Sequence, residues 1–110
     1  NQIENLTGDL FTNLSNLEVL DISHNKISVL PSGIFDDLGN LREFNAEGNK
    51  FQAFPPDLFS KTKRLDKIYL NYNGSLPPGF LSNLPNLQEV VLQGNHILKE
   101  LPQDLFWNSP

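Results

Sequence analysis

Apolar residues recur along the chain at fixed spacings. A leucine opens each of four segments, at positions 17, 41, 65 and 87, and further apolar residues follow it three and five positions later. The alternation of apolar and polar residues after each leucine is typical of a short strand with one buried face. The pattern therefore predicts strands near residues 19–21, 43–45, 67–69 and 89–91.

These segments belong to a repeating unit that covers the whole chain. Residues 1–16 match the last two-thirds of a unit, and four units follow, at 17–40, 41–64, 65–86 and 87–110. The third unit is two residues shorter than the first two. Neither end carries a polar capping motif, although a terminal unit would expose its apolar face. We therefore expect residues 1–110 to be an uncapped internal fragment of a longer array.

The second half of each unit predicts the far side of the core. A phenylalanine recurs there and is expected to stack from unit to unit, at Phe11, Phe35, Phe59 and Phe106. A proline opens the same stretch, at Pro31, Pro55, Pro77 and Pro102. Proline opposes a helix unless it lies in the first turn, so we expect little helix.

An asparagine occupies one position in successive units, at Asn1, Asn25, Asn49, Asn73 and Asn95. The chain turns off the strand here, and a carboxamide supplies both a donor and an acceptor to buried backbone groups. We expect these residues to form a ladder. Asn73 also begins the glycosylation pattern Asn73-Gly74-Ser75, and its unit lacks the apolar residue two positions later, so a glycan at Asn73 is the alternative.

Two further N-glycosylation patterns begin at Asn5 and Asn13, as Asn5-Leu6-Thr7 and Asn13-Leu14-Ser15. Both asparagines occupy variable positions of the unit, where we expect them to be exposed. They are candidate glycan sites, although such patterns also arise by chance in a chain rich in asparagine.

The unit LxxLxLxxNxL, followed by a variable stretch of the form LPxxxF, resembles the extracellular, 24-residue type of leucine-rich repeat. The variable stretches read LPSGIFDDL (30–38), FPPDLFSKT (54–62), LPPGFLSNL (76–84) and LPQDLFWNS (101–109). Toll and Toll-like receptors, Slit-like guidance proteins and lamprey variable lymphocyte receptors share this type. The phrases LPQDLF and LPPGFL are most similar to insect-type Toll receptor ectodomains.

The resemblance implies an α/β-type repeat solenoid, with short parallel strands on a concave face and mostly irregular convex segments. It also implies an extracellular or cell-surface segment of a receptor ectodomain that binds a protein ligand or co-receptor in Toll-like innate immune or developmental signalling. Receptor dimerisation fits the same interpretation. The alternative is a structural spacer or adhesion scaffold that makes no direct ligand contact.

Composition and residue spacing disfavour nucleic-acid binding, catalysis and metal binding. The formal charge is −5, with 13 acidic and 8 basic residues, which disfavours nucleic acid as a partner. The chain has no cysteine, and His24 and His96 lie at different positions of different units. Nothing in the spacing brings catalytic or metal-binding side chains together. We expect no enzymatic activity, no cofactor, no metal and no direct membrane contact in this segment.

The outward residues of the strands form the candidate interaction surface. Six acids and two bases make this face net negative by four, from Glu18, Asp21, Glu43, Glu47, Asp66 and Glu89 against Arg42 and Lys67. Tyrosines flanked by charge suit a protein interface, although strands favour Tyr and Val for other reasons too. We predict a partner with a basic patch, bound by Asp21, Glu43, Glu47, Lys67, Tyr69, Tyr72, Glu89 and Val91.

Overall fold

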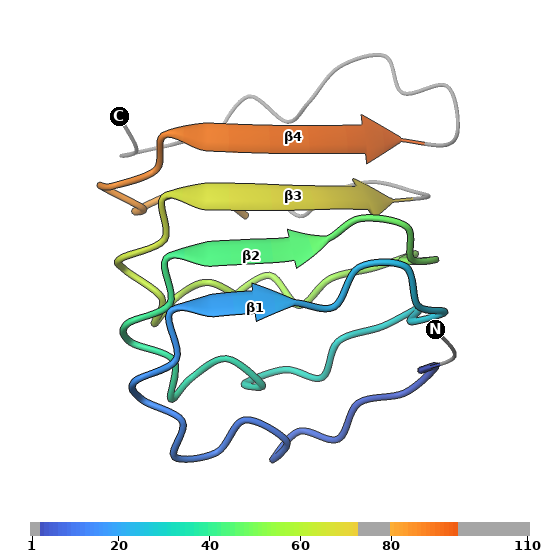
Figure 1. The fold of residues 1–110 in the computed structure, drawn as a ribbon, viewed down its shortest axis with the longest axis horizontal. Helices are drawn as coiled ribbons and strands as arrows, with labels where there is room; N and C mark the ends of the chain where they lie inside the picture. The colour runs from blue at the N-terminus through green and yellow to red at the C-terminus, as the bar shows by residue number, and fades with distance from the viewer. Residues whose placement is uncertain (1–2, 73–79, 95–110) are drawn as a thin grey trace.

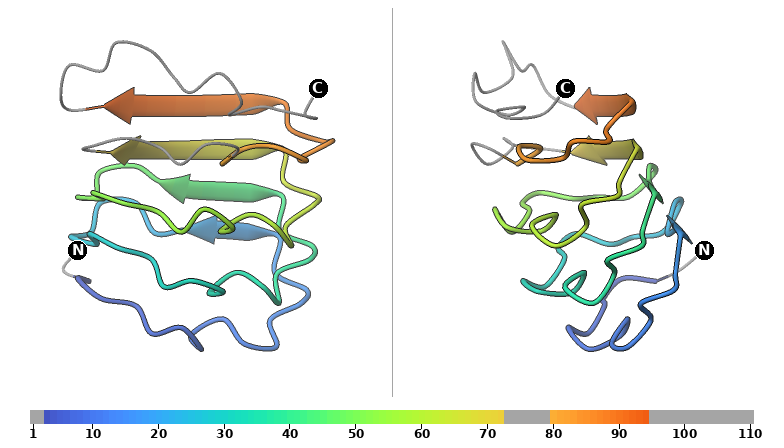
Figure 2. Two further views of the ribbon diagram at one scale, coloured as in Figure 1. Left: turned by 180° about the vertical axis from the view of Figure 1, so that it is seen from behind. Right: turned by 90° about the vertical axis from the view of Figure 1, so that its left-hand side faces the viewer.

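Four parallel strands form one sheet along one side of the protein. The computed structural model describes residues 3–72 and 80–94. The strands are β1 (Val19–Asp21), β2 (Glu43–Ala46), β3 (Lys67–Tyr72) and β4 (Glu89–Gly94), and they neighbour one another in chain order. Figure 2 shows the irregular segments stacked along the side opposite the strands. The predicted repeat solenoid is confirmed.

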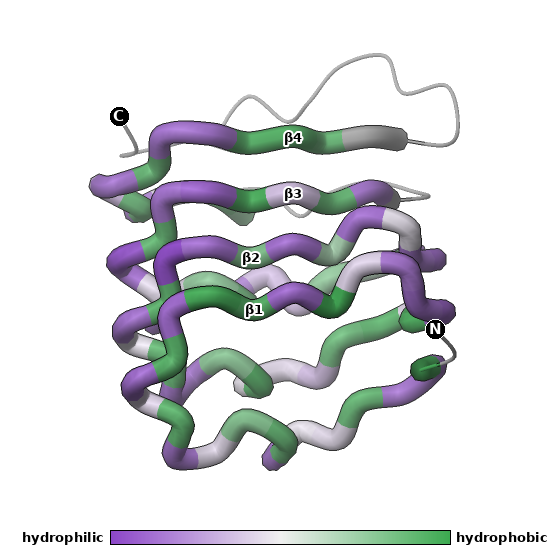
Figure 3. Tube along the Cα trace, in the orientation of Figure 1, coloured by the Kyte–Doolittle hydropathy of each residue, from purple (hydrophilic) through white to green (hydrophobic). Residues whose placement is uncertain are grey.

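The register of the sheet follows the repeat of the sequence. Val19 pairs with Glu43, Glu43 with Lys67, and Lys67 with Glu89. The last step is two residues shorter than the others, so the short third unit keeps the register of the sheet. Each unit therefore presents the same strand positions at the same height, and polar and apolar residues alternate along the strands (Figure 3).

Every strand begins where the sequence predicts, but only β1 ends there. Strand β2 is one residue longer than predicted, and β3 and β4 are each three residues longer. In β1 the Asp21 carboxylate accepts a hydrogen bond from the backbone N–H of Ser23, at 2.9 Å, and Asn45 does the same for Glu47, at 3.1 Å. Such bonds turn the chain away from the extended conformation. The third unit has Tyr69 at this position, which has no short acceptor, and β3 continues.

No helix occurs among residues 3–72 and 80–94, and that part of the chain holds no helix able to cross a membrane. The convex segments consist of single turns closed by bonds between residues three apart. Pro31 and Pro55 each open such a turn, and their carbonyls accept from Ile34 and Leu58. Pro77 and Pro102 lie outside the described residues.

The core lies between the sheet and these turns, and phenylalanines run through it. Phe35 is the centre, with its ring centroid 6.0 Å from that of Phe11 and 6.2 Å from that of Phe59. Phe44 of β2 meets Phe35 edge-on at 5.1 Å, which ties the sheet to the convex side. Aromatic pairs at such distances are attractive beyond their buried area.

The sequence analysis missed one member of this stack. Phe80 lies 5.1 Å from Phe59 and is 2 % exposed. Phe35 and Phe59 lie six residues before the leucine that opens the next unit, where the third unit has Leu81, and Phe80 stands one residue earlier, at the position of Ile34 and Leu58. The stretch LPPGF (76–80) shows this phenylalanine close to the aligned position, so the sequence could have indicated it. Phe106, which was predicted for the stack, lies outside the described residues.

Buried asparagines connect the units on the side where the strands end. The Asn49 side chain is 4 % exposed. Its Oδ1 accepts from the Ile27 N–H of the preceding unit at 3.1 Å, and its Nδ2 donates to the Ile22 carbonyl at 2.9 Å and the Ala46 carbonyl at 3.0 Å. Asn25 repeats this pattern, with its Oδ1 accepting from the Ile3 N–H at 3.2 Å. One side chain thus satisfies backbone groups of two units.

The third unit contributes a buried asparagine that the ladder prediction did not include. Asn71 is 9 % exposed and bonds the backbone of Asn49 in both directions, at 3.2 Å to its N–H and 3.1 Å to its carbonyl. The longer β3 carries Asn71 past the end of β2, where the Asn49 backbone would otherwise have no strand partner. Asn1, Asn73 and Asn95 lie outside the described residues, and their ladder role stays a prediction.

Replacing Asn49 with alanine should lower the free energy of unfolding by roughly 1–3 kcal/mol, because buried backbone groups of two units lose their partner. Asn16→Ala is the matched control, since Asn16 is exposed. Urea denaturation of both variants measures the two changes. Equal losses would show that the bonds of Asn49 contribute nothing particular to stability.

Candidate functional site

Two rows of side chains cross the sheet on the face that points away from the core, and this is the predicted concave face. The sheet register aligns the first row as Val19, Glu43, Lys67 and Glu89, and the second as Asp21, Asn45, Tyr69 and Val91. Val19 is 56 % exposed, whereas Tyr69 and Val91 are half-buried. The sheet therefore brings together six of the eight predicted partner-binding residues. The other two are Glu47, which follows β2, and Tyr72, at whose position only the backbone is described.

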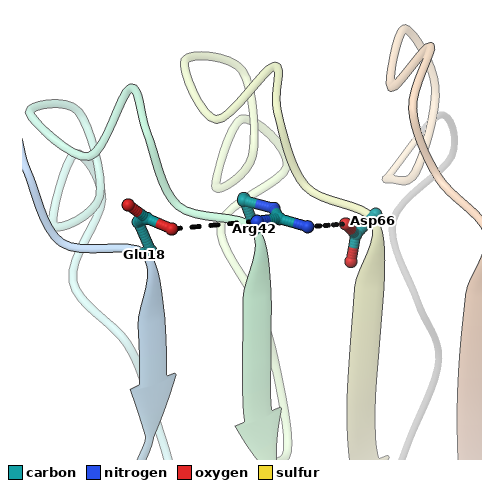
Figure 4. A network of polar contacts seen from close by, with 3 residues as sticks. All are labelled: Glu18, Arg42 and Asp66. Atoms are coloured by element: carbon teal, nitrogen blue, oxygen red, sulfur yellow. Dashed lines mark hydrogen bonds and ion pairs between the residues drawn. The ribbon is translucent and has the colours of Figure 1, made fainter.

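Arg42 joins two neighbouring carboxylates where the strands begin (Figure 4). Its guanidinium lies 3.8 Å from Oε1 of Glu18 and 3.4 Å from Oδ2 of Asp66. These three residues were predicted to contribute to the charge of the concave face. The pairs are exposed, so each contributes less than about 1 kcal/mol to stability. Arg42 offsets one of the two carboxylates, so most of the net negative charge of the face belongs to the residues around its centre.

Four carboxylates remain around the centre of the face, those of Asp21, Glu43, Glu47 and Glu89, against the single ammonium of Lys67. Among the described residues, none of these five side chains is part of an ion pair. The centre of the face is therefore net negative and its charges are available to a partner.

Tyr69 lies within this acidic centre. Its hydroxyl donates a hydrogen bond to Oε1 of Glu89, at 2.9 Å, across β3 and β4. That bond raises the pKa of the Tyr69 phenol, and loss of hydration and the nearby charges of Glu89, Glu43 and Asp66 act in the same direction. The phenol therefore stays neutral, and its ring is held in one place on the sheet.

Asp21 has a structural role as well as a charge. Its Oδ1 accepts from both the hydroxyl and the backbone N–H of Ser23, at 2.6 and 2.9 Å. The hydroxyl bond lowers the pKa of Asp21 most, followed by the backbone bond, and the charge of His24 acts in the same direction. Asp21 thus ends β1 and keeps its negative charge at neutral pH.

His24 follows directly on the same edge and needs a glycine beside it. A Cβ at Gly48 would come within 2.5 Å of Nδ1 of His24, and Gly48 has a φ of +76°. Only glycine fits that contact and that conformation without strain.

Within residues 3–72 and 80–94 no group of three or more His, Cys, Asp or Glu side chains could hold a metal ion.

The predicted glycan sites lie away from the strands. Asn5 and Asn13 are both exposed, and Asn13 has a φ of +67° in a convex turn. The Asn13 backbone N–H donates to Asp37 of the next unit, at 2.9 Å, and leaves the side chain free for modification. Asn73 lies outside the described residues.

Comparison with known proteins agrees with this architecture. The leucine-rich repeat family model matches residues 1–51 and 47–97. No curated protein matches the chain. Among solved structures, Toll in the Drosophila Toll–Spatzle complex is 34 % identical with a TM-score of 0.86, and covers 97 % of this chain. The glycosylated form of that complex gives 32 % identity, a TM-score of 0.83 and 97 % coverage.

The chain spans only 14 % and 15 % of the lengths of those two Toll chains. Both complexes are described as a hub in Drosophila development and innate immunity. The similarity confirms the predicted resemblance to insect Toll receptors.

The environment of Asp21 gives a prediction about pH. Its titration midpoint, followed by NMR of the carboxyl carbon, should lie below the ordinary value of about 3.9. Ser23→Ala should raise this midpoint by removing the hydroxyl bond, and His24→Gln should raise it less. Because the folded pKa is depressed, the stability from the bond is present above the unfolded pKa and is lost as the pH falls through the folded one. A midpoint insensitive to Ser23→Ala would show that the hydroxyl bond does not set it.

Proposed function

Because the chain belongs to the leucine-rich repeat family, we propose that it is an extracellular, Toll-like receptor segment that binds a protein ligand or co-receptor through its concave face. The similarity to Toll solved with Spatzle supports a receptor role. The two aligned rows make the face a regular surface, and among the described residues no group of His, Cys, Asp or Glu could hold a metal ion, which favours binding over metal-dependent chemistry.

The observation that carries the proposal is the position of Tyr69. Its ring is half-buried on the sheet and its hydroxyl is held by Glu89 at 2.9 Å. A tyrosine that is already fixed loses little conformational freedom when a partner covers it, so it suits the centre of an interface. Val91, beside it in the same row, extends the apolar area.

The charges around Tyr69 determine the chemistry of the partner. The carboxylates of Glu43 and Glu89 lie in the row next to Tyr69, and Glu47 follows at the end of β2. A lysine or arginine of the partner would meet both these carboxylates and the face of the aromatic ring. We infer a partner with a basic patch. A Spatzle-type ligand is the first candidate, by analogy with Toll.

The glycan sites and the location fit this proposal. Glycans at Asn5 and Asn13 would project from exposed positions outside the strands, so the concave face would stay accessible. We propose both as modified residues of an extracellular chain. A ligand that bridges two copies of the receptor would bring such segments together as a dimer.

The second candidate is a spacer, and specific contacts favour it. Arg42, Asp21 and Asn45 all use their side chains within the concave face itself, for ion pairs or to end a strand. Part of the polar character of the face therefore serves the fold. Tyr69 and the carboxylates of Glu43 and Glu47 are the groups that distinguish the two candidates.

Kinetics of a Spatzle-type protein binding to the surface-captured chain test the proposal. Glu43→Lys with Glu47→Lys should lower the association rate, most at low salt, because complementary charge steers association. Tyr69→Ala should raise the dissociation rate about tenfold or more, because buried aromatic contacts hold the complex together. Tyr69→Phe keeps the ring and should change it less.

Asp9→Lys with Asp36→Lys is the matched control, since both residues are exposed outside the strands and the change in net charge is the same. This variant should leave both rates close to those of the parent chain. If the concave variants fold and also leave both rates unchanged, the segment is a spacer and the proposal is wrong.

A further inference from the structure

One turn of the stack differs from its counterparts in charge. Residues 61–64 read Lys-Thr-Lys-Arg, whereas the corresponding turns read Asn-Leu-Ser-Asn (13–16), Asp-Leu-Gly-Asn (37–40) and Asn-Leu-Pro-Asn (83–86). We name Lys61, Lys63 and Arg64 the basic turn. It leads into β3 on the side of the molecule where the strands begin (Figure 1). The three cations contrast with a chain whose formal charge is −5.

Packing does not require this sequence. Thr62 stands where the other turns have a leucine, and it is fully buried, so its hydroxyl must bond the Phe59 carbonyl at 3.2 Å. Arg64 stands where Asn40 of the preceding unit donates to the Ser15 carbonyl at 2.8 Å. The basic turn therefore lacks two features of the preceding turn, the buried leucine and the asparagine that bonds the neighbouring unit. Stability alone does not account for its lysines and arginine.

The charges of the basic turn are not neutralised by the protein. All three residues are exposed, and the ion pairs among the described residues belong to Arg42. Lys63 donates from Nζ to the Asn83 carbonyl at 3.2 Å, which positions the ammonium and keeps its charge. Lys61 and Arg64 extend freely into solvent.

Two shallow depressions border the basic turn. One, of about 210 Å³, has Lys63 and Asp57 as its charged residues, and the rest of its lining comes from Ser60, Ser82, Asn83, Pro56, Phe59 and Phe80. The other, of about 350 Å³, is lined by Arg42, Arg64, Asp66, Asn86 and Gln88. The carboxylate of Asp66 is already paired with Arg42. Together the two depressions hold three cations, those of Lys63, Arg42 and Arg64, against the carboxylates of Asp57 and Asp66, and their other polar residues carry hydroxyls and carboxamides.

We propose that the basic turn binds a sulfated polysaccharide that lies across these two depressions. Sulfate esters carry a fixed negative charge that guanidinium and ammonium groups bind. The sugar hydroxyls between the sulfates match the hydroxyl and carboxamide groups of the depressions. A long polyanion avoids the acidic concave face, so it binds on the flank and leaves that face open to a protein.

This inference shares with the proposed function only the extracellular location. Apart from Arg42 and Asp66, which lie where the strands begin and line one depression, it concerns different residues from the concave face, and its failure would leave the proposal for Tyr69 and its carboxylates unaffected. Single-stranded nucleic acid is a poorer match, because such binding uses exposed aromatic rings, and Phe59 and Phe80 are each 2 % exposed.

Calorimetric titration of the intact chain with a heparin oligosaccharide tests the proposal. The chain should bind it, and the affinity should fall steeply as sodium chloride screens the charges. Lys61→Ala with Arg64→Asn should weaken binding about tenfold, since each exposed ion pair contributes up to about fivefold. The conservative Lys61→Arg with Arg64→Lys should bind like the parent, which separates charge from any effect on folding.

Lys26→Ala with Lys50→Ala is the matched control, because it removes two exposed lysines and the same charge from the opposite edge of the sheet. It should change the affinity less than about twofold, as expected for distant charges that are screened by salt. No binding by the parent chain, or equal losses in the two alanine-containing variants, would overturn the proposal. Equal binding of poly-glutamate with matched charge would overturn it in favour of an acidic protein partner.

Discussion

The structure depends on hydrogen bonds between buried asparagine side chains and the backbone of the neighbouring unit. In the described part of the chain, the turns that follow β1 and β2 contain backbone N–H and C=O groups that have no strand partner. Asn49 serves groups at Ile22, Ile27 and Ala46 with one carboxamide. An unsatisfied buried group would cost roughly 1–3 kcal/mol. Among the described residues, the carboxamides of Asn25, Asn49 and Asn71 remove this cost and connect each unit to the one before it.

That fixed register makes the concave face possible. Because every unit presents the same positions at the same height, Tyr69 meets Glu89 across two strands, and Arg42 lies between Glu18 and Asp66. The same stacking places the basic turn beside the turn at residues 83–86, and the two depressions are lined by residues of both turns. One repeated scaffold thus carries an acidic face, which we propose binds a protein, and the basic turn, which we propose binds a polyanion.

The spacing of apolar residues was sufficient to predict the sheet, its order and most of the core, because a repeat states the same local rule several times. The errors arose where one unit breaks the rule. The strands end early where Asp21 or Asn45 accepts a hydrogen bond from the backbone N–H two residues later, and β3 continues because Tyr69 cannot do this. The spacing of apolar residues carries no information about such a local bond. Asn71 was missed because the longer β3 brings it beside the Asn49 backbone, and Phe80 was missed because it lies one residue before the position where the first two full units have phenylalanine. The ion pairs of Arg42 with Glu18 and Asp66 could not be predicted, because they depend on how far apart the side chains of neighbouring strands lie.

Native-state hydrogen exchange tests the role of the asparagine bonds most directly. The backbone N–H groups of Ile27 and Asn49 bond to carboxamide oxygens of the next unit, at 3.1 and 3.2 Å, outside any strand. If those bonds hold the units together, both amides should exchange as slowly as those within β2 and β3, through global unfolding. Exchange of Ile27 and Asn49 at the rate of exposed turn amides, while the strands stay protected, would contradict the account.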